Sequence, residues 1–106
     1  MKKPAASKKE IDEFEAVFFA LSHRSRRHIL LSLSQKNSPM LGGEIADLLS
    51  CSWPTTTSHL QNLEQAGLVT VEKQGREQLY EINTKRLNVV QKWLEKVRGK
   101  EPDKVG

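Results

Sequence analysis

The stretch that most constrains the fold runs from residue 52 to residue 83, where a helical pattern is followed at once by two strand-like runs. Ser52 suits the N-cap of a helix, and Pro54 is tolerated in a first turn because that amide has no helical partner. The helix is expected to stop at Gly67, a residue type favoured just after a helix end. The runs LVTVEK and EQLYEIN then flank QGR, so Gly75 predicts the turn of a β-hairpin.

Helical patterns also surround this unit. Apolar residues recur at helical spacing in residues 11–23, 25–35 and 41–50, and again in residues 84–99. Ser25 is the expected N-cap of the second of these helices. The order is therefore four helices, a hairpin and a last helix. Two short helices joined by a tight turn, with a hairpin directly after them, predict a mainly α winged helix-turn-helix.

Length and composition agree with one small domain. The chain has 106 residues, of which 37% are hydrophobic, and this is enough for a small core but not for a large enclosed active site. A chain this short gains stability when it buries apolar surface in an oligomer. We expect the domain over residues 10–99, with a flexible basic tail at residues 1–9 and a disordered tail at residues 100–106.

The charge balance is compatible with a polyanionic partner. The formal net charge is +4, which suits nucleic acid, although an ordinary solvated basic surface explains the same number. The single cysteine excludes an intrachain disulfide and fits a reducing compartment. The sequence shows neither a signal peptide nor a transmembrane run, so we expect a soluble cytoplasmic protein with no membrane partner.

A helical wheel at about 100° per residue divides residues 53–66 into two faces. Thr56, Leu60 and Leu63 share the side that we expect to face the core. The opposite side carries short, uncharged hydrogen-bonding groups, which suit the base edges of a major groove. The expected DNA-contacting residues on this side, beside Pro54, are Thr55, Thr57, Ser58, Gln61 and Asn62. An ordinary polar helix surface is the alternative interpretation.

Positive charge for phosphate groups must come from outside this helix, because its polar face is uncharged. Lys73 and Arg76 at the hairpin are the expected contacts, with Arg76 in a minor groove or against the DNA backbone. The basic tail, Arg24 and Arg27 are further candidates. Arg26 keeps two roles open, a phosphate contact or an anchor that holds its helix to an acidic neighbour.

Three segments resemble, in their order and spacing, the ArsR/SmtB family of bacterial transcriptional repressors: ALSHRSRRHILLSL, GEIADLLSCSWPTTTSHLQNLEQAGLV and KQGREQLYEIN. The likeness covers residues 14–98 and is most specific from Ser52 to Leu60. It implies a repressor that binds double-stranded DNA as a homodimer, with two recognition helices in successive major grooves of an inverted repeat. Thr55, Thr57 and Ser58 fall on the groove-contacting run of the family.

The resemblance also implies a dimer interface made by the first and last helices. This agrees with the wide apolar face of residues 11–23 and with the coiled-coil-like seam of residues 84–99. The expected interface residues are Phe14, Phe18, Leu87, Val90, Leu94 and Val97.

Three residues of the central segment keep two interpretations each. His59 falls on the usual histidine of the family and is a candidate base contact, yet it lies beside the core side, where a buried hydrogen-bonding role is at least as reasonable. Trp53 is either a cover over the turn or a side chain stacked on the DNA backbone. Cys51 is either a small buried side chain or a redox-sensitive thiol near a helix N-terminus.

Metal, cofactor and catalytic chemistry are not expected. Metal-sensing members of the family use a Cys-x-Cys segment in the third helix, or carboxylates and histidines in the last helix. This sequence has neither set, and it resembles the branch without metal ligands. Cys51 and His59 imitate a nucleophile and a base, but a turn and half a helix separate them and no third group orients them. We expect no enzyme, and the sequence leaves any effector unknown.

Two other functions stay open. One is a winged-helix module that binds proteins and not DNA, which would more typically show an exposed apolar patch in place of a hydroxyl-rich helix. The other is a repressor that responds to oxidation of Cys51.

Overall fold

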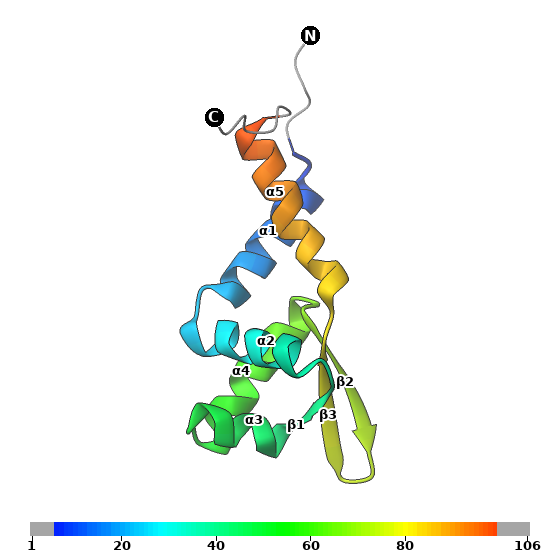
Figure 1. The fold of residues 1–106 in the computed structure, drawn as a ribbon. Helices are drawn as coiled ribbons and strands as arrows, with labels where there is room; N and C mark the ends of the chain where they lie inside the picture. The colour runs from blue at the N-terminus through cyan, green and yellow to red at the C-terminus, as the bar shows by residue number, and fades with distance from the viewer. Residues whose placement is uncertain (1–5, 100–106) are drawn as a thin grey trace, which may run out of the picture.

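The computed structural model describes residues 6–99, and these form two parts that share one core. Figure 1 shows α1 and α5 side by side, projecting from a body that contains the other helices and a small sheet. The elements follow in the order α1 (Lys8–Leu21), α2 (Arg24–Lys36), β1 (Met40–Leu41), α3 (Gly42–Leu49), α4 (Trp53–Gln65), β2 (Val69–Gln74), β3 (Glu77–Ile82), the 3-10 helix η1 (Thr84–Leu87) and α5 (Asn88–Arg98). The predicted mainly α winged helix-turn-helix is confirmed. Every helix in the described part of the chain is too short or too polar to cross a membrane.

The start of α1 corrects the expected N-terminal tail. Ser7 is the N-cap, because its hydroxyl accepts a hydrogen bond from the amide of Glu10 at 3.1 Å. The Glu10 carboxylate accepts in return from the amide of Ser7 at 3.2 Å, which completes a capping box. Lys8 and Lys9 therefore belong to the helix, and a tail reaching to residue 9 was wrong at its end. The rest of that tail, residues 1–5, and the expected tail at 100–106 lie outside the described residues.

The start of α2 also differs from the prediction. The expected N-cap was Ser25, but the helix begins at Arg24 and His23 is the cap. Nδ1 of His23 accepts a hydrogen bond from the amide of Ser25 at 3.1 Å. Histidine is an uncommon N-cap, so the usual preference for serine pointed two residues too far along the chain.

The sheet contains one strand more than the predicted hairpin. The strand order is β1-β3-β2, and all pairs are antiparallel. The hairpin of β2 and β3 turns at Gly75, which has a φ of 63°. The added strand β1 pairs Met40 with Tyr80 and Leu41 with Leu79. Two residues are too few to show the alternating pattern by which a strand is recognised in a sequence.

The core lies between α4, the other helices and the sheet. The predicted core side of α4 is confirmed, because Thr56, Leu60 and Leu63 are each at most 1% exposed. The hydroxyl of Thr56 donates to the carbonyl oxygen of Ser52 at 3.0 Å, so burial leaves this polar group paired. Large side chains from α2, α3 and the strand region complete the cluster: Ile29, Leu33, Ile45 and Leu68.

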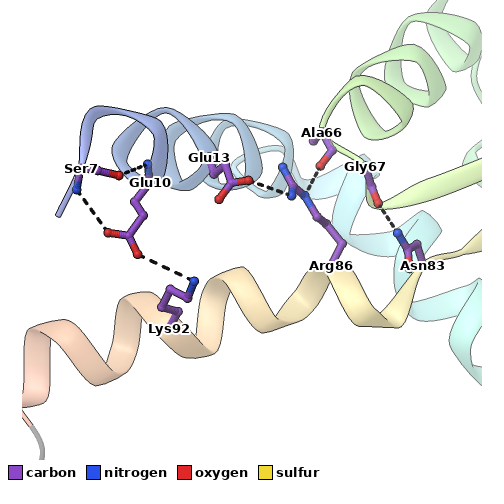
Figure 2. A network of polar contacts seen from close by, with 8 residues as sticks. All are labelled: Ser7, Glu10, Glu13, Ala66, Gly67, Asn83, Arg86 and Lys92. Atoms are coloured by element: carbon purple, nitrogen blue, oxygen red, sulfur yellow. Dashed lines mark hydrogen bonds and ion pairs between the residues drawn. The ribbon is translucent and has the colours of Figure 1, made fainter.

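Two side chains join the C-terminal end of α4 to the helices that project from the body (Figure 2). Arg86 donates from Nε to the carbonyl oxygen of Ala66 at 2.8 Å, and its Nη1 lies 3.5 Å from Oε2 of Glu13 on α1. Asn83 donates from Nδ2 to the carbonyl oxygen of Gly67 at 2.9 Å. Helix ends leave carbonyl groups without helical partners, and these two side chains bind such groups. The position of α4 is therefore tied to that of α1 and α5.

The start of α4 is fixed by a contact between an aromatic ring and a glycine. The indole of Trp53 lies so close to Gly42, the first residue of α3, that a β-carbon on Gly42 would be 2.7 Å from Cη2 of the ring. The ring of Tyr80 on β3 lies near the same point, at 3.5 Å from that position. The indole of Trp53 thus lies beside the start of α3 and close to β3, while 53% of the residue stays exposed. Stacking of this ring on the DNA backbone stays a prediction.

We predict that Gly42→Ala displaces the indole of Trp53. The added methyl group has no room, and overpacking of this kind costs about 1–3 kcal/mol. The expected result is a lower thermal midpoint and a changed tryptophan emission spectrum.

Gly43→Ala is the matched control, because a β-carbon on Gly43 meets no atom within 4 Å. Alanine is a better helix former than glycine by up to about 1 kcal/mol, so this variant should be as stable as the wild type or more so. If both variants behave alike, Trp53 is not held against Gly42.

Candidate nucleic-acid interface

The surface of α4 away from the core carries hydroxyl and amide groups. Thr55, Ser58 and Gln61 are exposed, whereas Thr57 and Asn62 are half-buried. Ser52 caps the helix by accepting a hydrogen bond from the amide of Thr55 at 3.3 Å. The predicted start of the helix, with Ser52 as N-cap and proline in the first turn, is confirmed. The predicted division of α4 into a core face and a polar face therefore holds in the folded chain.

The candidate residues differ in how free their polar groups are. Nδ2 of Asn62 donates to the carbonyl oxygen of Ser58 at 3.0 Å, so this amide is partly used within its own helix. The hydroxyl of Thr55 accepts from the hydroxyl of Ser52 at 3.0 Å. The hydroxyl oxygen of Thr57 is buried and has no hydrogen-bond partner among the described residues. Ser58 and Gln61 carry the polar side chains that are most available to a partner.

The hairpin of β2 and β3, the wing of this fold, brings positive charge close to the start of α4. Lys73 and Arg76 are exposed near its turn. Arg76 and Trp53 line the same cleft of about 280 Å³, whose wall also includes Gly42. Glu77 lines this cleft as well, so the charge of the wing is mixed. The turn of the wing and the first turn of α4 are thus neighbours on the surface.

His59 is the candidate whose place the structure corrects. It is only 7% exposed, and its Nδ1 lies 3.2 Å from Nη1 of Arg26. A base contact needs an accessible polar edge, and His59 has little surface left for one. Burial lowers the pKa of its imidazole below the usual value, and the nearby charges of His23 and Arg26 act in the same direction. Of the two roles that the sequence left open for His59, the structure supports the buried hydrogen-bonding role.

Arg26 has a structural role in place of a phosphate contact. Only 6% of its surface is exposed, and it donates from Nε to the carbonyl oxygen of Ala20 at 2.7 Å. Its Nη2 donates to the carbonyl oxygen of Phe19 at 3.0 Å. The anchor is thus the C-terminal end of α1, and not the acidic side chain that the sequence suggested. Carbonyl groups at a helix C-terminus attract a cation through their partial negative charge.

The apolar residues of α1 and α5 divide into two sets. Phe14 is buried within the protomer at 7% exposure, and Leu87 and Val90 are half-buried against the core. Phe14 therefore offers little surface to a second copy, which corrects its place among the interface candidates. Leu94 and Val97 are 39% and 63% exposed.

Three side chains outside the expected set widen this surface, namely Trp93, Phe19 and Ile11. Phe18 packs against Trp93 with ring centroids 5.0 Å apart and an angle of 73° between the planes. Phe19 is 62% exposed and Ile11 is 47% exposed, although neither was among the candidates. A helix that carries apolar residues on more than one stripe packs on more than one surface. The wide apolar face of residues 11–23 therefore already indicated a second contact surface on α1.

The thiol and the histidine that imitate a catalytic pair do not interact. Sγ of Cys51 lies 3.5 Å from the carbonyl oxygen of Leu49, and Nδ1 of His59 is directed at Arg26. Cys51 is half-buried. Within residues 6–99, no three side chains of the His, Cys, Asp and Glu types lie close enough together to hold a metal ion.

Several known proteins are similar to this chain in sequence and in architecture. A family model described as a helix-turn-helix domain matches residues 21–72. The transcriptional repressor SdpR of Bacillus subtilis (strain 168) is 35% identical over 78 residues, which cover 74% of this chain and 84% of SdpR. An ArsR-like transcriptional regulator from Rhodococcus sp. RHA1 is 32% identical with a TM-score of 0.72, over 83% of this chain and 81% of that one.

A third likeness concerns the fold alone. The homodimeric winged helix-turn-helix DNA-binding domain Mb0332 from Mycobacterium bovis is 24% identical, with a TM-score of 0.68 over 95% of this chain and 94% of that one. The extent of the match to SdpR, the helix-turn-helix model and the shared architecture lead to one assignment. This chain belongs to the ArsR family of winged helix-turn-helix transcriptional regulators, and it carries a helix-turn-helix DNA-binding domain.

Proposed function

We propose that the protein is a homodimeric repressor that binds an inverted repeat, with α4 in the major groove and the wing against the flanking DNA. One observation carries the proposal: the uncharged polar face of α4 begins beside Arg76 of the wing, because Trp53 and Arg76 line one cleft. A major groove admits a helix whose short polar side chains meet base edges, while arginine and lysine contact phosphates.

The exposed groups of α4 suit this role in different ways. Ser58 and Gln61 read base edges, because their side chains are exposed on the face away from the core. Thr55 lies in the first turn, the part of a recognition helix that approaches the bases most closely. Thr57 is less suited than these three, because its hydroxyl oxygen is buried and offers no accessible polar group to a base edge.

Lys73 and Arg76 supply charge to the DNA backbone. Both are exposed, and neither forms an ion pair with a side chain of the described residues. Such free cations release condensed counterions from DNA when they bind phosphate, so their contribution to DNA affinity falls as the salt concentration rises.

Homodimer formation through α1 and α5 is supported by the apolar surface that these helices leave uncovered. Val97, Leu94 and Trp93 of α5 are 63%, 39% and 36% exposed, beside the exposed Phe19 and Ile11 of α1. Patches of this kind mark protein interaction sites. The Mycobacterium bovis domain of similar fold is homodimeric. Two copies related by a two-fold axis present two recognition helices to two half-sites, which makes the preferred operator an inverted repeat.

Repression follows from occupancy of a promoter by the bound dimer. The relative SdpR is a transcriptional repressor by name, and it aligns with most of this chain. A partner-binding module without DNA contacts is less well supported, because the polar face of α4 is hydroxyl-rich rather than apolar.

Selection of bound sequences from random duplex DNA tests the proposal as a whole. We expect an enriched inverted repeat whose half-site centres lie about one helical turn, or a multiple of it, apart. Enrichment of a single half-site would contradict the dimer, and absence of any enriched sequence would contradict specific recognition.

Two alanine variants separate base recognition from phosphate binding. Arg76→Ala should weaken binding to all sequences and reduce the slope of log affinity against log salt by about 1. Ser58→Ala should leave that slope unchanged but relax the preference for one base pair, at a cost of about 1–3 kcal/mol for the cognate base. Fluorescence anisotropy on the selected and a scrambled duplex, at two salt concentrations, measures both.

Lys8→Ala serves as the charge control for Arg76→Ala. Lys8 is the first residue of α1, and 90% of its side chain is exposed. Helix α1 starts at the end of the molecule opposite to the wing (Figure 1). An equal loss of salt dependence in both variants would mean that the wing makes no specific phosphate contact.

A charged residue on α5 should break the dimer without unfolding the protomer. Val97→Asp places a carboxylate on a position that is 63% exposed in the protomer, so the protomer tolerates it. An unpaired charge buried between two copies costs several kcal/mol, about 2 or more, and dissociation should follow. Analytical ultracentrifugation measures the change in mass, and anisotropy measures the accompanying loss of DNA affinity.

Leu31→Asp is the matched control, because Leu31 on α2 is similarly exposed at 57% and lies outside α1 and α5. It should stay dimeric. A dimer that survives Val97→Asp would refute the interface on α5.

A further inference from the structure

Two imidazoles and a guanidinium meet where α1, α2 and α4 come together. His59 of α4 lies with its Nδ1 3.2 Å from Nη1 of Arg26 on α2. The ring of His23, the N-cap of α2, lies 4.4 Å from that of His59, with an angle of 50° between the planes. Arg26 also holds the carbonyl oxygens of Phe19 and Ala20 at the end of α1. This cluster of His59, His23 and Arg26 connects α4, the proposed recognition helix, to α1, which carries part of the proposed dimer surface.

The hydrogen bonds fix where the protons lie. A guanidinium has only donors, so Nδ1 of His59 must accept from Arg26, and the proton of the neutral ring is on Nε2. Nδ1 of His23 likewise accepts, from the amide of Ser25 at 3.1 Å. The observed arrangement therefore requires a neutral His59, and it uses the same ring nitrogen of His23 as an acceptor.

A second proton would give His59 a positive charge that no negatively charged side chain of the described residues balances. The groups that face the ring are the Arg26 guanidinium from α2 and the His23 imidazole from the N-terminus of α2. Within the described residues, no carboxylate forms an ion pair with His23, Arg26 or His59. The carbonyl oxygens at the end of α1 already accept from Arg26. Protonation would convert an accepting nitrogen into a donor that faces another donor, in a site where His59 is 7% exposed.

We propose that protonation of His59 breaks its hydrogen bond to Arg26, and so separates α4 from the residue that binds the end of α1. The DNA affinity of the protein then falls under mildly acidic conditions. The proposal rests on the proposed function, because it takes α4 as the helix that contacts DNA. His59 is a positioning residue here: it touches Arg26 rather than the nucleic acid.

The sign of the effect follows from linkage. Burial and the nearby charges lower the pKa of His59 in the folded protein. A lowered pKa means that the stabilising effect of the neutral ring is fully present above the unfolded value of about 6.5 and is lost as the pH falls below it. DNA binding needs α4 in place, so DNA should lower the pKa of His59 further by reciprocity.

Ordinary electrostatics predicts the opposite trend. Histidine protonation in general adds positive charge to a protein as the pH falls. Added positive charge strengthens the attraction to DNA phosphates. An affinity that falls with pH therefore cannot come from net charge, and it identifies a local structural cause.

Affinity for the selected duplex at two pH values tests the proposal. Between about pH 7.5 and about pH 5, a range that extends well below the usual imidazole pKa because that of His59 is lowered, the wild type should weaken at least about fivefold, the lower limit of common coupling effects. His59→Asn keeps an acceptor, Oδ1, where Nδ1 stands, but does not titrate. It should bind like the wild type at the higher pH and lose less than about twofold at the lower pH.

His28→Asn is the matched control, because His28 is exposed on α2 and is the third histidine of the chain. It should keep the full pH response of the wild type. A pH response that persists in His59→Asn, or that disappears equally in His28→Asn, would overturn the proposal. A wild type that fails to bind any duplex at the higher pH would contradict the proposed function instead.

A measurement without DNA covers the case in which His59→Asn does not fold. In the wild type, NMR titration should give His59 a pKa below the usual imidazole value, and thermal unfolding should show a midpoint that falls with pH below about 6.5. A His59 pKa at or above the usual imidazole value, with an unchanged unfolding midpoint, would overturn the proposal without any variant.

Discussion

The buried guanidinium of Arg26 is the interaction on which the arrangement of helices depends. It is 6% exposed, and three of its N–H groups bind two carbonyl oxygens at the end of α1 and one nitrogen of His59 on α4. A cation removed from water needs such partners to be stable. The requirement fixes three helices relative to one another at a single point, and the aromatic ring of Phe19, 5.2 Å away, covers one side of it.

Helix α4, the proposed recognition helix, is held at both ends as well as in its middle. Trp53 rests against Gly42 at its start, and Asn83 and Arg86 bind carbonyl groups at its end. The contacts at the end lead to α1 through Glu13, the same helix that Arg26 holds (Figure 2). The position of α4 is therefore set by the α1 and α5 pair from two directions. In a dimer built on that pair, this rigidity would determine the spacing of the two recognition helices.

Much of the fold followed from local patterns. The capped helix from Ser52 to Gly67, the hairpin turn at Gly75 and the core side of α4 depend on residues close in sequence, and all three agree with the structure. The N-cap of α2 and the strand β1 were missed, because an unusual cap and a two-residue strand leave no clear local pattern. The candidate DNA-contacting face was also visible in the sequence, since a helical wheel needs only the spacing of polar residues.

The sequence by itself determined which residues of α4 are polar, where the helix begins and ends, and that a basic hairpin follows it. Only the tertiary structure decided the roles of Arg26, His59 and Phe14. Local sequence did not distinguish a core position from a surface contact for any of the three, and each is buried by partners that are distant in the chain or on another helix. Arg26 and His59 are 33 positions apart, and their hydrogen bond exists because packing of α2 against α4 brings them together. Local sequence patterns carry no signal for such a pair, because its energy comes from burial that the whole fold creates.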